Sequence, residues 1–395
     1  MLTNAQRAII KSTVPLLEAG GEALTKHLYT MLLREFAEVR PLFNPAHQAS
    51  GDQPRALANG ILMYAKNIDR LEALGDLSAQ IVNKHVSLQI QPEHYPIVGA
   101  CLLRSIREVL GADIATDAVI DAWAAGYQQL ADILIQAEEQ AYAQIEAAPG
   151  GWRGERSFRV TRKEPESSEI TSFYMEPADG GPLAQHLPGQ YLGLRLQIAG
   201  QDQRRSYSLS AAPNGKELRI SVKRQADGWV SNHLHDHVLP GDLLQVFPPA
   251  GIFTLAESSK PLVLISAGVG ITPTMAMLQQ ALKTSRPIYF IHCARNRVVH
   301  AFRETVDDLQ AIHPQLKRFY AYSEVTQAAD ADGVDGVGRL DKERLAKWLP
   351  SNLDVEVYFL GPQPFMAWVK RNLKVLGVPE SQTHFEFFGP ASALN

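Results

Sequence analysis

The spacing of apolar residues changes twice along this chain and divides it into three parts. Up to about residue 147, apolar side chains recur every three to four residues, which predicts helices. The stretch 148–154, Ala-Pro-Gly-Gly-Trp-Arg-Gly, breaks this pattern as a short linker. Beyond it the period falls to about two, and from about residue 258 apolar strands alternate with helices. We therefore expect an all-α domain at 1–147, an antiparallel β-barrel at 148–257 and an α/β parallel-sheet domain at 258–395.

Length and composition narrow the class of protein. A chain of 395 residues suggests two or three domains, and a net charge of −4 implies no nucleic-acid or anionic-membrane partner. Cys101 and Cys293 lie far apart, which excludes a disulfide scaffold, a cysteine zinc site and an iron–sulfur cluster. The N-terminus lacks the apolar core of a signal peptide, and the most apolar run, 261–271, is too short and glycine-rich to span a bilayer. We expect a cytoplasmic protein with no stable membrane insertion.

One histidine lies on an apolar helical face in the first part. Ile81, His85 and Leu88 follow the i, i+4, i+7 spacing, so they share one face of a helix. Pro92 is expected to open the next helix, where its missing N–H costs nothing, and Tyr95 is the next inward residue. His85 is either a core histidine bonded to a backbone carbonyl or an axial haem ligand.

The last predicted helix of this part carries a carboxylate, Glu138, on the same face as an aromatic and aliphatic row: Trp123, Tyr127, Leu130 and Leu134. A carboxylate on an apolar face costs free energy unless it is paired. Glu138 therefore lies either at the exposed end of a long helix or beside a partner. A carboxylate partner makes a ligand imidazole more basic and pushes electron density to the metal, which favours oxygen activation over release.

Six short segments without intervening helices predict the barrel, at 158–163, 170–176, 190–196, 205–210, 218–224 and 243–247. Within it, Arg205-Ser206-Tyr207-Ser208 resembles the R-x-Y-S/T motif of the ferredoxin-reductase superfamily. Strand alternation places Arg205 and Tyr207 on one face. An arginine can grip a pyrophosphate with two hydrogen bonds, a tyrosine ring offers a stacking surface to flavin, and a serine beside flavin N5 can steer the hydride-accepting atom.

A second flavin motif follows about twenty residues later. The stretch 228–232, Gly-Trp-Val-Ser-Asn, resembles the family's G-x-V-S-N loop, whose amides at a helix start would hold the FAD pyrophosphate; the contact residues are Val230 and Ser231. Tyr191 supplies one more ring. His233 and His237 have the spacing of metal ligands, but no further ligand cluster accompanies them.

The third part carries the signature of a dinucleotide site. An apolar strand at 261–266 runs into a glycine-containing turn and a helix expected at 274–282. The turn resembles the G-x-G-x-T-P form of the reductase superfamily, in which a pyrophosphate approaches the helix N-terminus. The implied NAD(P)-binding residues are Gly268, Val269, Gly270, Ile271, Thr272, Pro273, Gly361 and Pro362. Most relatives have cysteine near the nicotinamide where this chain has Leu360. Arg295 and Arg297 follow the second strand, where they could bind the 2′-phosphate of NADPH. The sequence therefore leaves the choice between NADH and NADPH open.

Taken together, residues 1–147 resemble a globin and the whole chain resembles a flavohaemoglobin. The resemblance implies that Phe43 packs on the haem, and that Tyr29 and Gln53 are the distal pair that hydrogen-bonds iron-bound dioxygen. On the proximal side, it implies that His85 is the ligand of haem b and that Tyr95 and Glu138 contact it.

The same resemblance assigns residues between the cofactors and at the C-terminal end. Lys84 lies near the haem edge, and Glu386 near the flavin–haem gap. Phe388 lies over the flavin ring in relatives until nicotinamide displaces it. The implied FAD contacts at this end are Phe387, Phe388, Gly389 and Pro390, and the alternative is an ordinary last strand. His94, beside Tyr95, is a competing ligand candidate.

The activity implied by the resemblance is nitric oxide dioxygenation. NAD(P)H reduces FAD, FAD reduces haem b, and the dioxygen complex of the haem oxidises nitric oxide to nitrate. The alternatives are an NAD(P)H-dependent reductase of oxygen or alkyl hydroperoxides, and a haem gas sensor. The expected partners are dioxygen, nitric oxide and NAD(P)H. A lipid in the distal haem pocket stays open, and we expect a monomer.

Overall fold

The computed structural model describes residues 2–43, 48, 51–325 and 332–388. Two compact units form along the chain, one made by residues 1–147 and the other by most of the residues from 148 onward. The predicted order of an all-α part, an antiparallel barrel and a parallel-sheet part is confirmed.

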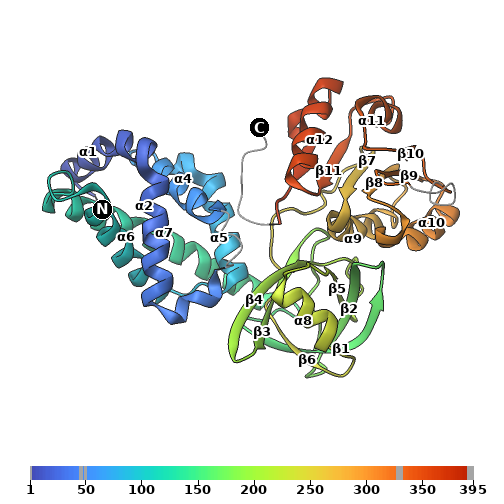
Figure 1. The fold of residues 1–395 in the computed structure, drawn as a ribbon, viewed down its shortest axis with the longest axis horizontal. Helices are drawn as coiled ribbons and strands as arrows, with labels where there is room; N and C mark the ends of the chain where they lie inside the picture. The colour runs from blue at the N-terminus through green and yellow to red at the C-terminus, as the bar shows by residue number, and fades with distance from the viewer. Residues whose placement is uncertain (1, 44–47, 49–50, 326–331, 389–395) are drawn as a thin grey trace. The chain divides into compact units, whose positions relative to one another are not determined.

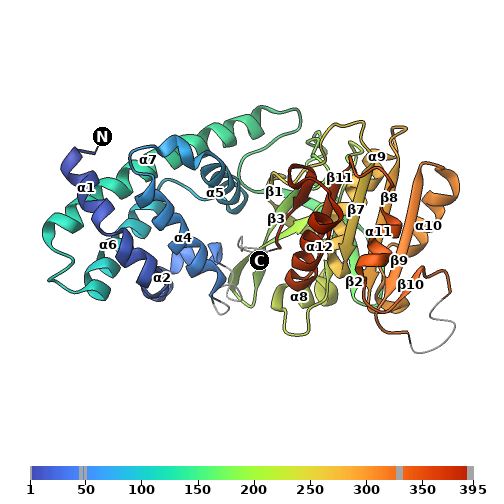
Figure 2. The ribbon, with the colours of Figure 1, turned by 90° about the horizontal axis from the view of Figure 1, so that it is seen from above.

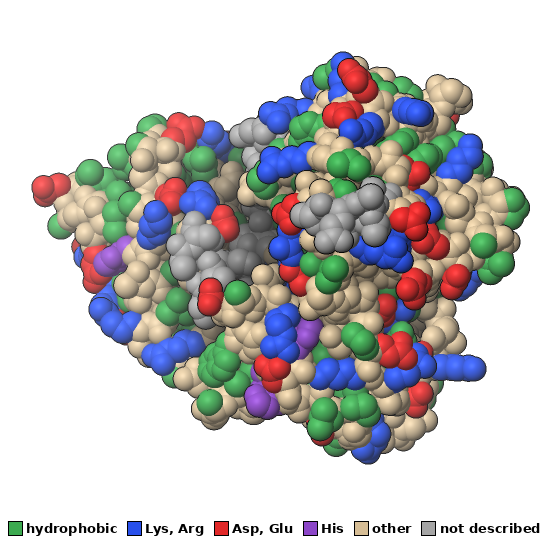
Figure 3. All heavy atoms as spheres, turned by 45° about the vertical axis from the view of Figure 1, so that its right-hand side comes forward, with side chains coloured by type: hydrophobic (Ala, Val, Ile, Leu, Met, Phe, Trp, Pro, Cys, Tyr) green, Lys and Arg blue, Asp and Glu red, His purple; other side chains and the backbone are tan. Residues whose placement is uncertain are grey.

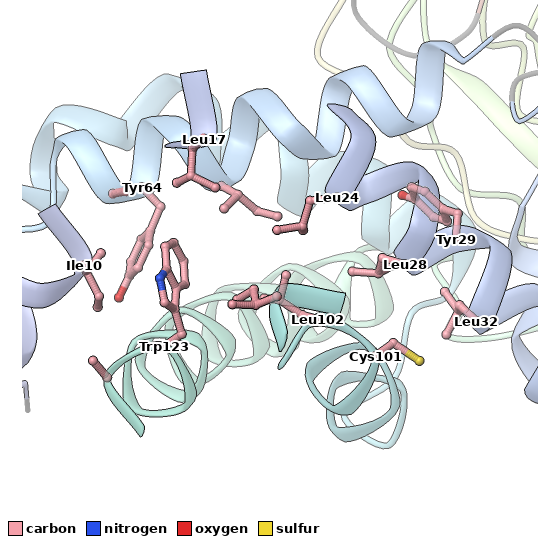
Figure 4. Close-up of a cluster of buried hydrophobic side chains, with 14 of the residues drawn as sticks. Ile10, Leu17, Leu24, Leu28, Tyr29, Leu32, Tyr64, Cys101, Leu102 and Trp123 are labelled. Carbon is pink, nitrogen blue, oxygen red and sulfur yellow. The ribbon is translucent and has the colours of Figure 1, made fainter. Parts of the chain in front are cut away.

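The first unit contains six long helices and two short 3₁₀ segments among its described residues (Figure 1). The helices are α1 Asn4–Ser12, α2 Val14–Glu35, α4 Asp52–Lys66, α5 Gly75–Leu88, α6 His94–Leu110 and α7 Asp117–Ala147, and the 3₁₀ segments are η1 Ala37–Leu42 and η2 Leu71–Leu74. Their apolar faces meet in one core. Figure 4 shows Leu24 and Leu28 of α2 near Leu102 of α6, and Tyr64 of α4 near Trp123 of α7.

The sequence indicates a helix start at 51–54 with Asp52 as the possible cap, and another at Pro92, and both predictions are wrong by one or two residues. Gly51, in the left-handed region at φ 74°, is the cap of α4, and Asp52 is already helical, with its carboxylate accepting from Arg55 Nη2 at 2.6 Å. Glycine takes this conformation without strain, and no side chain of the cap residue bonds to the helix start. The helix α6 begins at His94, and Pro92 lies in the turn before it.

The barrel is a six-stranded sheet in the order β4-β3-β6-β1-β2-β5. Its strands are β1 Arg156–Pro165, β2 Ile170–Pro177, β3 Tyr191–Ile198, β4 Gln201–Ser208, β5 Leu218–Lys223 and β6 Leu243–Val246, and the helix α8 Trp229–His237 belongs to the same part. An antiparallel bridge from Leu209 to Ile220 joins the continuation of β4 to β5 and so closes the sheet. Phe158, Phe173 and Leu194 are fully buried inside it.

The parallel sheet has the order β10-β9-β8-β7-β11-β12 (Figure 2). Its strands are β7 Leu262–Ala267, β8 Ile288–Ala294, β9 Leu316–Tyr322, β10 Gly336–Val337, β11 Glu356–Leu360 and β12 Thr383–Phe385. Alternate residues of β7 enter separate cores, so both faces are covered. The helices α9 Ile271–Ala281 and α10 Arg303–Ile312 pack on one face, and α11 Lys342–Trp348 and α12 Gln363–Leu376 on the other.

The helix α9 begins at Ile271, three residues before the predicted start. Pro273 is the third residue of the helix, within the first turn, where backbone N–H groups have no helical partner, so the proline is tolerated. Because of this early start, the glycine turn leads directly into the helix N-terminus.

The surface drawn in Figure 3 carries acidic and basic side chains interspersed among the described residues. None of the described helices is long and apolar enough to cross a bilayer.

Candidate functional site

His85 lies in the last turn of α5 and is held from two other helices. Its Nδ1 is 2.7 Å from Glu138 Oε1 of α7 and 3.1 Å from Tyr95 Oη of α6. Tyr95 Oη also donates to Glu138 Oε1 at 2.6 Å. The structure thus brings together the three proximal residues suggested by the sequence. Glu138 is 2% exposed, so it is not at the exposed end of a helix.

The electrostatics of this cluster follow from burial. The pKa of Tyr95 is raised, first by burial and then by its hydrogen bond to the Glu138 carboxylate, so the phenol stays protonated and donates. Since Nδ1 of His85 is occupied, its free nitrogen is Nε2, for which no hydrogen bond is found among the described residues. The His85 side chain is 30% exposed. One imidazole nitrogen bonded to a carboxylate and the other open is the donor arrangement of a metal-ligating histidine.

Two further tyrosines support the cluster and were not singled out as site residues from the sequence. Tyr127 Oη donates to the carbonyl oxygen of Tyr95 at 2.7 Å, and Tyr142 Oη donates to that of Ile90 at 2.8 Å. A Cβ on Gly99 would lie 2.6 Å from the Tyr127 ring, so glycine there lets the ring lie against α6. The sequence feature that could have identified Tyr127 is its place on the same helical face as Glu138.

His94 is engaged by the backbone. Its Nδ1 accepts from the Gln91 N–H at 3.0 Å, and burial lowers its pKa. This contact uses one ring nitrogen to close the turn before α6, and the carboxylate cluster forms at His85 instead.

The predicted distal pair, Tyr29 and Gln53, comes from α2 and α4, and Phe43 follows η1 directly. The rings of Tyr29 and Phe43 meet edge to face with centroids 5.4 Å apart. Tyr29 is 8% exposed, and burial raises its pKa. Gln53 Oε1 accepts from Gln48 Nε2 at 2.8 Å. A buried neutral phenol is a hydrogen-bond donor across the physiological pH range. Lys84 is exposed beside His85.

The flavin motif occupies the end of β4. Burial lowers the pKa of Arg205 and raises that of Tyr207, which packs against the barrel core, while Ser206 is exposed and Ser208 half-buried. Tyr191 stands at the start of β3. A Cβ on Gly251, whose φ is 111°, would lie 2.9 Å from the Tyr191 ring, so only glycine accommodates the ring here.

The loop before α8 is locked by a serine. Ser231 Oγ donates to the Gly228 carbonyl at 3.0 Å and accepts from the Gln225 N–H at 3.1 Å. Val230 is 3% exposed and anchors the helix start in the barrel core. These contacts present the first amides of a nine-residue helix in a fixed geometry, which suits a phosphate group.

The two predicted NAD(P) segments lie against each other at the carboxyl ends of β7 and β11. A Cβ on Gly270 would lie 2.6 Å from the Leu360 carbonyl oxygen and 3.0 Å from the Gly361 nitrogen. Thr272 Oγ1 donates to the Val269 carbonyl at 2.9 Å and closes the turn. Gly268 has a φ of 54°, and Ile271 and Pro273 are in the first turn of α9, with Pro362 at the cap of α12.

Several remaining candidates have different placements. Arg295 forms an ion pair with Glu169 of the barrel. His233 and His237 have ring centroids 5.2 Å apart, and no group of three metal-ligating side chains occurs in the described parts of the chain. Phe388 is 50% exposed after β12, where Phe387 packs against the sheet and Glu386 lies between the strand and these rings. Gly389 and Pro390 lie outside the described residues.

Three known families match successive parts of the chain. The Globin family matches residues 26–134, the Oxidoreductase FAD-binding domain residues 157–255, and the Oxidoreductase NAD-binding domain residues 264–371. A flavohemoprotein of Pseudomonas putida is 68% identical over 394 residues, and one of Pseudomonas aeruginosa is 65% identical over 395, each covering 100% of both chains.

Two solved structures are also similar. The flavohemoglobin of Malassezia yamatoensis, with bound FAD and heme, matches with a TM-score of 0.85 and 25% identity over 98% of this chain and 100% of the other. The flavohem-like FAD/NAD-binding domain of nitric oxide dioxygenase from Vibrio cholerae matches with a TM-score of 0.55 and 36% identity, covering 60% of this chain and 100% of the other.

Proposed function

Because this chain belongs to the flavohemoprotein family, we propose that it is an NAD(P)H-dependent nitric oxide dioxygenase that uses FAD and haem b. Two nitric oxide and two dioxygen molecules would consume one NAD(P)H and give two nitrates, one NAD(P)⁺ and one proton. The observation that carries the proposal is the bond between His85 Nδ1 and the buried Glu138 carboxylate.

Haem b would be held through His85 Nε2, and when bound it supplies an iron that binds dioxygen and takes up single electrons. Glu138 accepts from His85 and so makes the imidazole a stronger donor. Tyr95 donates to the same carboxylate oxygen and fixes its direction. On the distal side, the Tyr29 hydroxyl is the donor for negative charge that develops on a bound ligand, with Gln53 as the second polar group.

FAD would lie on Tyr207 and Tyr191, with its pyrophosphate at Arg205 and the start of α8; it supplies the conversion from hydride to single-electron transfer. Arg205 provides two parallel donors for phosphate oxygens, and Ser208 a hydroxyl beside the reacting ring. Gly270 and Gly361 provide the close backbone approach that a dinucleotide pyrophosphate needs. Phe388, Lys84 and Glu386 keep the roles implied by the resemblance as part of this proposal.

The test is nicotinamide consumption by the purified protein under air, measured with and without nitric oxide. We expect a Soret band with a flavin shoulder, reduction of the haem by anaerobic NADH, and strong acceleration by nitric oxide with two nitrates formed per NADH. Negligible acceleration by nitric oxide would contradict the proposal.

A second candidate, reduction of alkyl hydroperoxides or of oxygen itself, is favoured by the same His85–Glu138 bond, since a strong proximal donor also promotes O–O cleavage. Replacing nitric oxide by an alkyl hydroperoxide, or by oxygen alone, in the same assay separates the two. We further propose a cytoplasmic monomer, with the preference between NADH and NADPH decided by the same measurement.

A further inference from the structure

Arg219 of β5 is a buried cation that none of the proposed cofactor sites uses. It is 7% exposed, its Nε donates to Ser210 Oγ at 3.1 Å, and its Nη1 donates to Tyr174 Oη at 3.4 Å. Its Nη2 donates to the Ser210 carbonyl oxygen. No ion pair joins Arg219 to a carboxylate in the part of the chain that the structure describes. Burying a charge costs free energy unless it is hydrogen-bonded and paired, so the position of Arg219 calls for an explanation.

A file of serine hydroxyls connects Arg219 to a carboxylate. Ser210 Oγ is 2.7 Å from Ser221 Oγ, which is 2.7 Å from Ser172 Oγ, and Ser172 donates to Glu166 Oε1 at 2.6 Å. The three serines are buried, and burial raises the pKa of Glu166. The file ties three separate barrel segments to one guanidinium. Such a network makes the backbone around Ser210 resistant to displacement.

Ser210 stands two residues after Ser208 of the proposed flavin motif. Its N–H donates to the Arg219 carbonyl at 2.8 Å, and Leu209 bridges to Ile220 beside it. Arg219 therefore binds Ser210 in three ways. Its backbone carbonyl accepts from the Ser210 N–H, and its guanidinium donates to the Ser210 carbonyl and to the Ser210 hydroxyl. These contacts fix the backbone directly after β4, next to segment 205–208.

The Arg219 guanidinium also contacts a residue of the parallel-sheet domain. Its central carbon lies 4.9 Å from the ring centroid of Phe302, which is 2% exposed. Phe302 has a φ of 62°, an uncommon conformation for a residue with a Cβ, and such conformations persist only where the surroundings hold them. His300, two residues earlier, is bonded through Nδ1 to Tyr322 Oη of β9 at 2.7 Å. Phe302 also belongs to the buried core of the parallel-sheet domain, so its ring is held by that domain.

We propose that Arg219 is a positioning residue that holds segment 205–208 in register with the dinucleotide-binding domain and so sets the approach of nicotinamide to flavin. The inference rests on the proposed function only for the binding of FAD and NAD(P)H, and it is independent of nitric oxide. A displacement of the reacting atoms by about 1 Å can lower a rate by about a hundredfold, so a small shift at this junction is enough to be measured.

The experiment compares Arg219→Met, Arg219→Lys and Phe302→Leu in the full-length holoprotein. Flavin reduction by NADH is followed anaerobically in a stopped-flow instrument, together with NADH affinity, flavin circular dichroism and the long-wavelength absorbance of the flavin–nicotinamide pair. We expect Arg219→Met to retain FAD and haem, to bind NADH within about threefold of the parent and to reduce flavin about ten- to a hundredfold more slowly. Arg219→Lys should recover part of the loss, because it restores charge but not the planar fork.

The matched control is Arg162→Met. Arg162 also stacks on Tyr174, at 3.7 Å from the ring centroid, but it is half exposed and is paired with Glu164. It should reduce flavin within about twofold of the parent rate, since an exposed pair contributes little.

Unchanged flavin reduction and an unchanged long-wavelength band in both Arg219→Met and Phe302→Leu would overturn the inference. If Arg219→Met loses FAD, Phe302→Leu decides alone, and a parental rate in that variant overturns it. Failure of nitric oxide consumption with normal flavin reduction would count against the proposed function and leave this inference standing.

Discussion

Replacing Glu138 by glutamine removes one negative charge from the proximal cluster and keeps the shape of the side chain. The carboxylate is 2% exposed and forms bonds of 2.6 Å with Tyr95 and 2.7 Å with His85. A hydrogen bond to a charged group contributes about 1.5–3 kcal/mol, and a neutral one about 0.5–1.5 kcal/mol. The variant should therefore lose about 1–1.5 kcal/mol of the interaction that favours the more positive, oxidised iron.

The lost interaction energy can be expressed as a change in the reduction potential of the haem. Because a tenfold change in a one-electron equilibrium corresponds to about 59 mV and about 1.4 kcal/mol, the haem potential should rise by about 40–65 mV. A spectroelectrochemical titration of the Soret and visible bands measures it. Tyr95→Phe should shift the potential in the opposite direction, since the carboxylate then loses a competing donor and binds His85 more strongly.

Glu139→Gln is the matched control, because Glu139 is the next residue on α7, is exposed and loses the same formal charge. Its potential should stay within about 10 mV of the parent, as screened surface charges interact weakly. A Glu138→Gln potential that is unchanged or lowered, in a protein with a parental urea midpoint, would refute the argument that the carboxylate strengthens the ligand.

Other variants test the remaining parts of the site. His85→Ala should lose haem but retain FAD and NADH-to-dye activity, and a normal haem content would remove the ligand assignment. Tyr29→Phe lacks a donor worth about 1–1.5 kcal/mol, so dioxygen should leave the reduced protein about tenfold faster in flash photolysis; an unchanged rate would exclude this hydroxyl. In Gly270→Ala, the new Cβ would lie 2.6 Å from the Leu360 carbonyl oxygen, and we expect a loss of about 1–3 kcal/mol in urea unfolding together with weaker NADH binding; a parental midpoint would contradict the close approach. Burial lowers the pKa of His292 to about 3, so its contribution to stability is complete above the unfolded value near pH 6.5 and falls as the pH drops towards 3. His292→Gln should therefore flatten the decline of unfolding free energy between pH 6.5 and 4 by about 1.4 kcal/mol per pH unit, and equal slopes in the two proteins would disprove this.

The local sequence patterns predicted the fold where the apolar residues of an element pack into one core. In the barrel, β1 alternates buried and exposed residues around Val160, whereas β5 is buried along almost all of its length. The strand at 262–267 is continuous in apolar residues because both of its faces are covered. The errors at Asp52 and Pro92 have another origin. Either residue type can start a helix, and the choice of Gly51 and His94 depended on backbone conformation and on a side chain that accepts from Gln91.

Some contacts of the candidate site could also be expected from the sequence, and others could not. The residues alone indicated only that His85 and Glu138 are polar residues on apolar faces and that each needs a partner, and the pairing of the two was implied by the resemblance. The supporting bonds of Tyr127 and Tyr142 go to backbone carbonyls, which carry no identity in the sequence. The contact between Arg219 and Phe302 joins residues far apart in the chain, and nothing local to either residue predicts it.

Leu360 shows how a departure from a family pattern is resolved by packing. The side chain is 1% exposed and belongs to the core between β7, β8 and α9, while its carbonyl oxygen faces the position where Gly270 lacks a Cβ. The glycine turn is therefore shaped at this point by the backbone of residue 360, and the backbone is the same for leucine and cysteine. Exchanging the two side chains changes the volume of the core by a few methyl groups but leaves the approach of Gly270 to Gly361 intact. The part of the dinucleotide site that depends on this approach is thus independent of the side chain at 360, so the departure from cysteine does not weaken the assignment of the site.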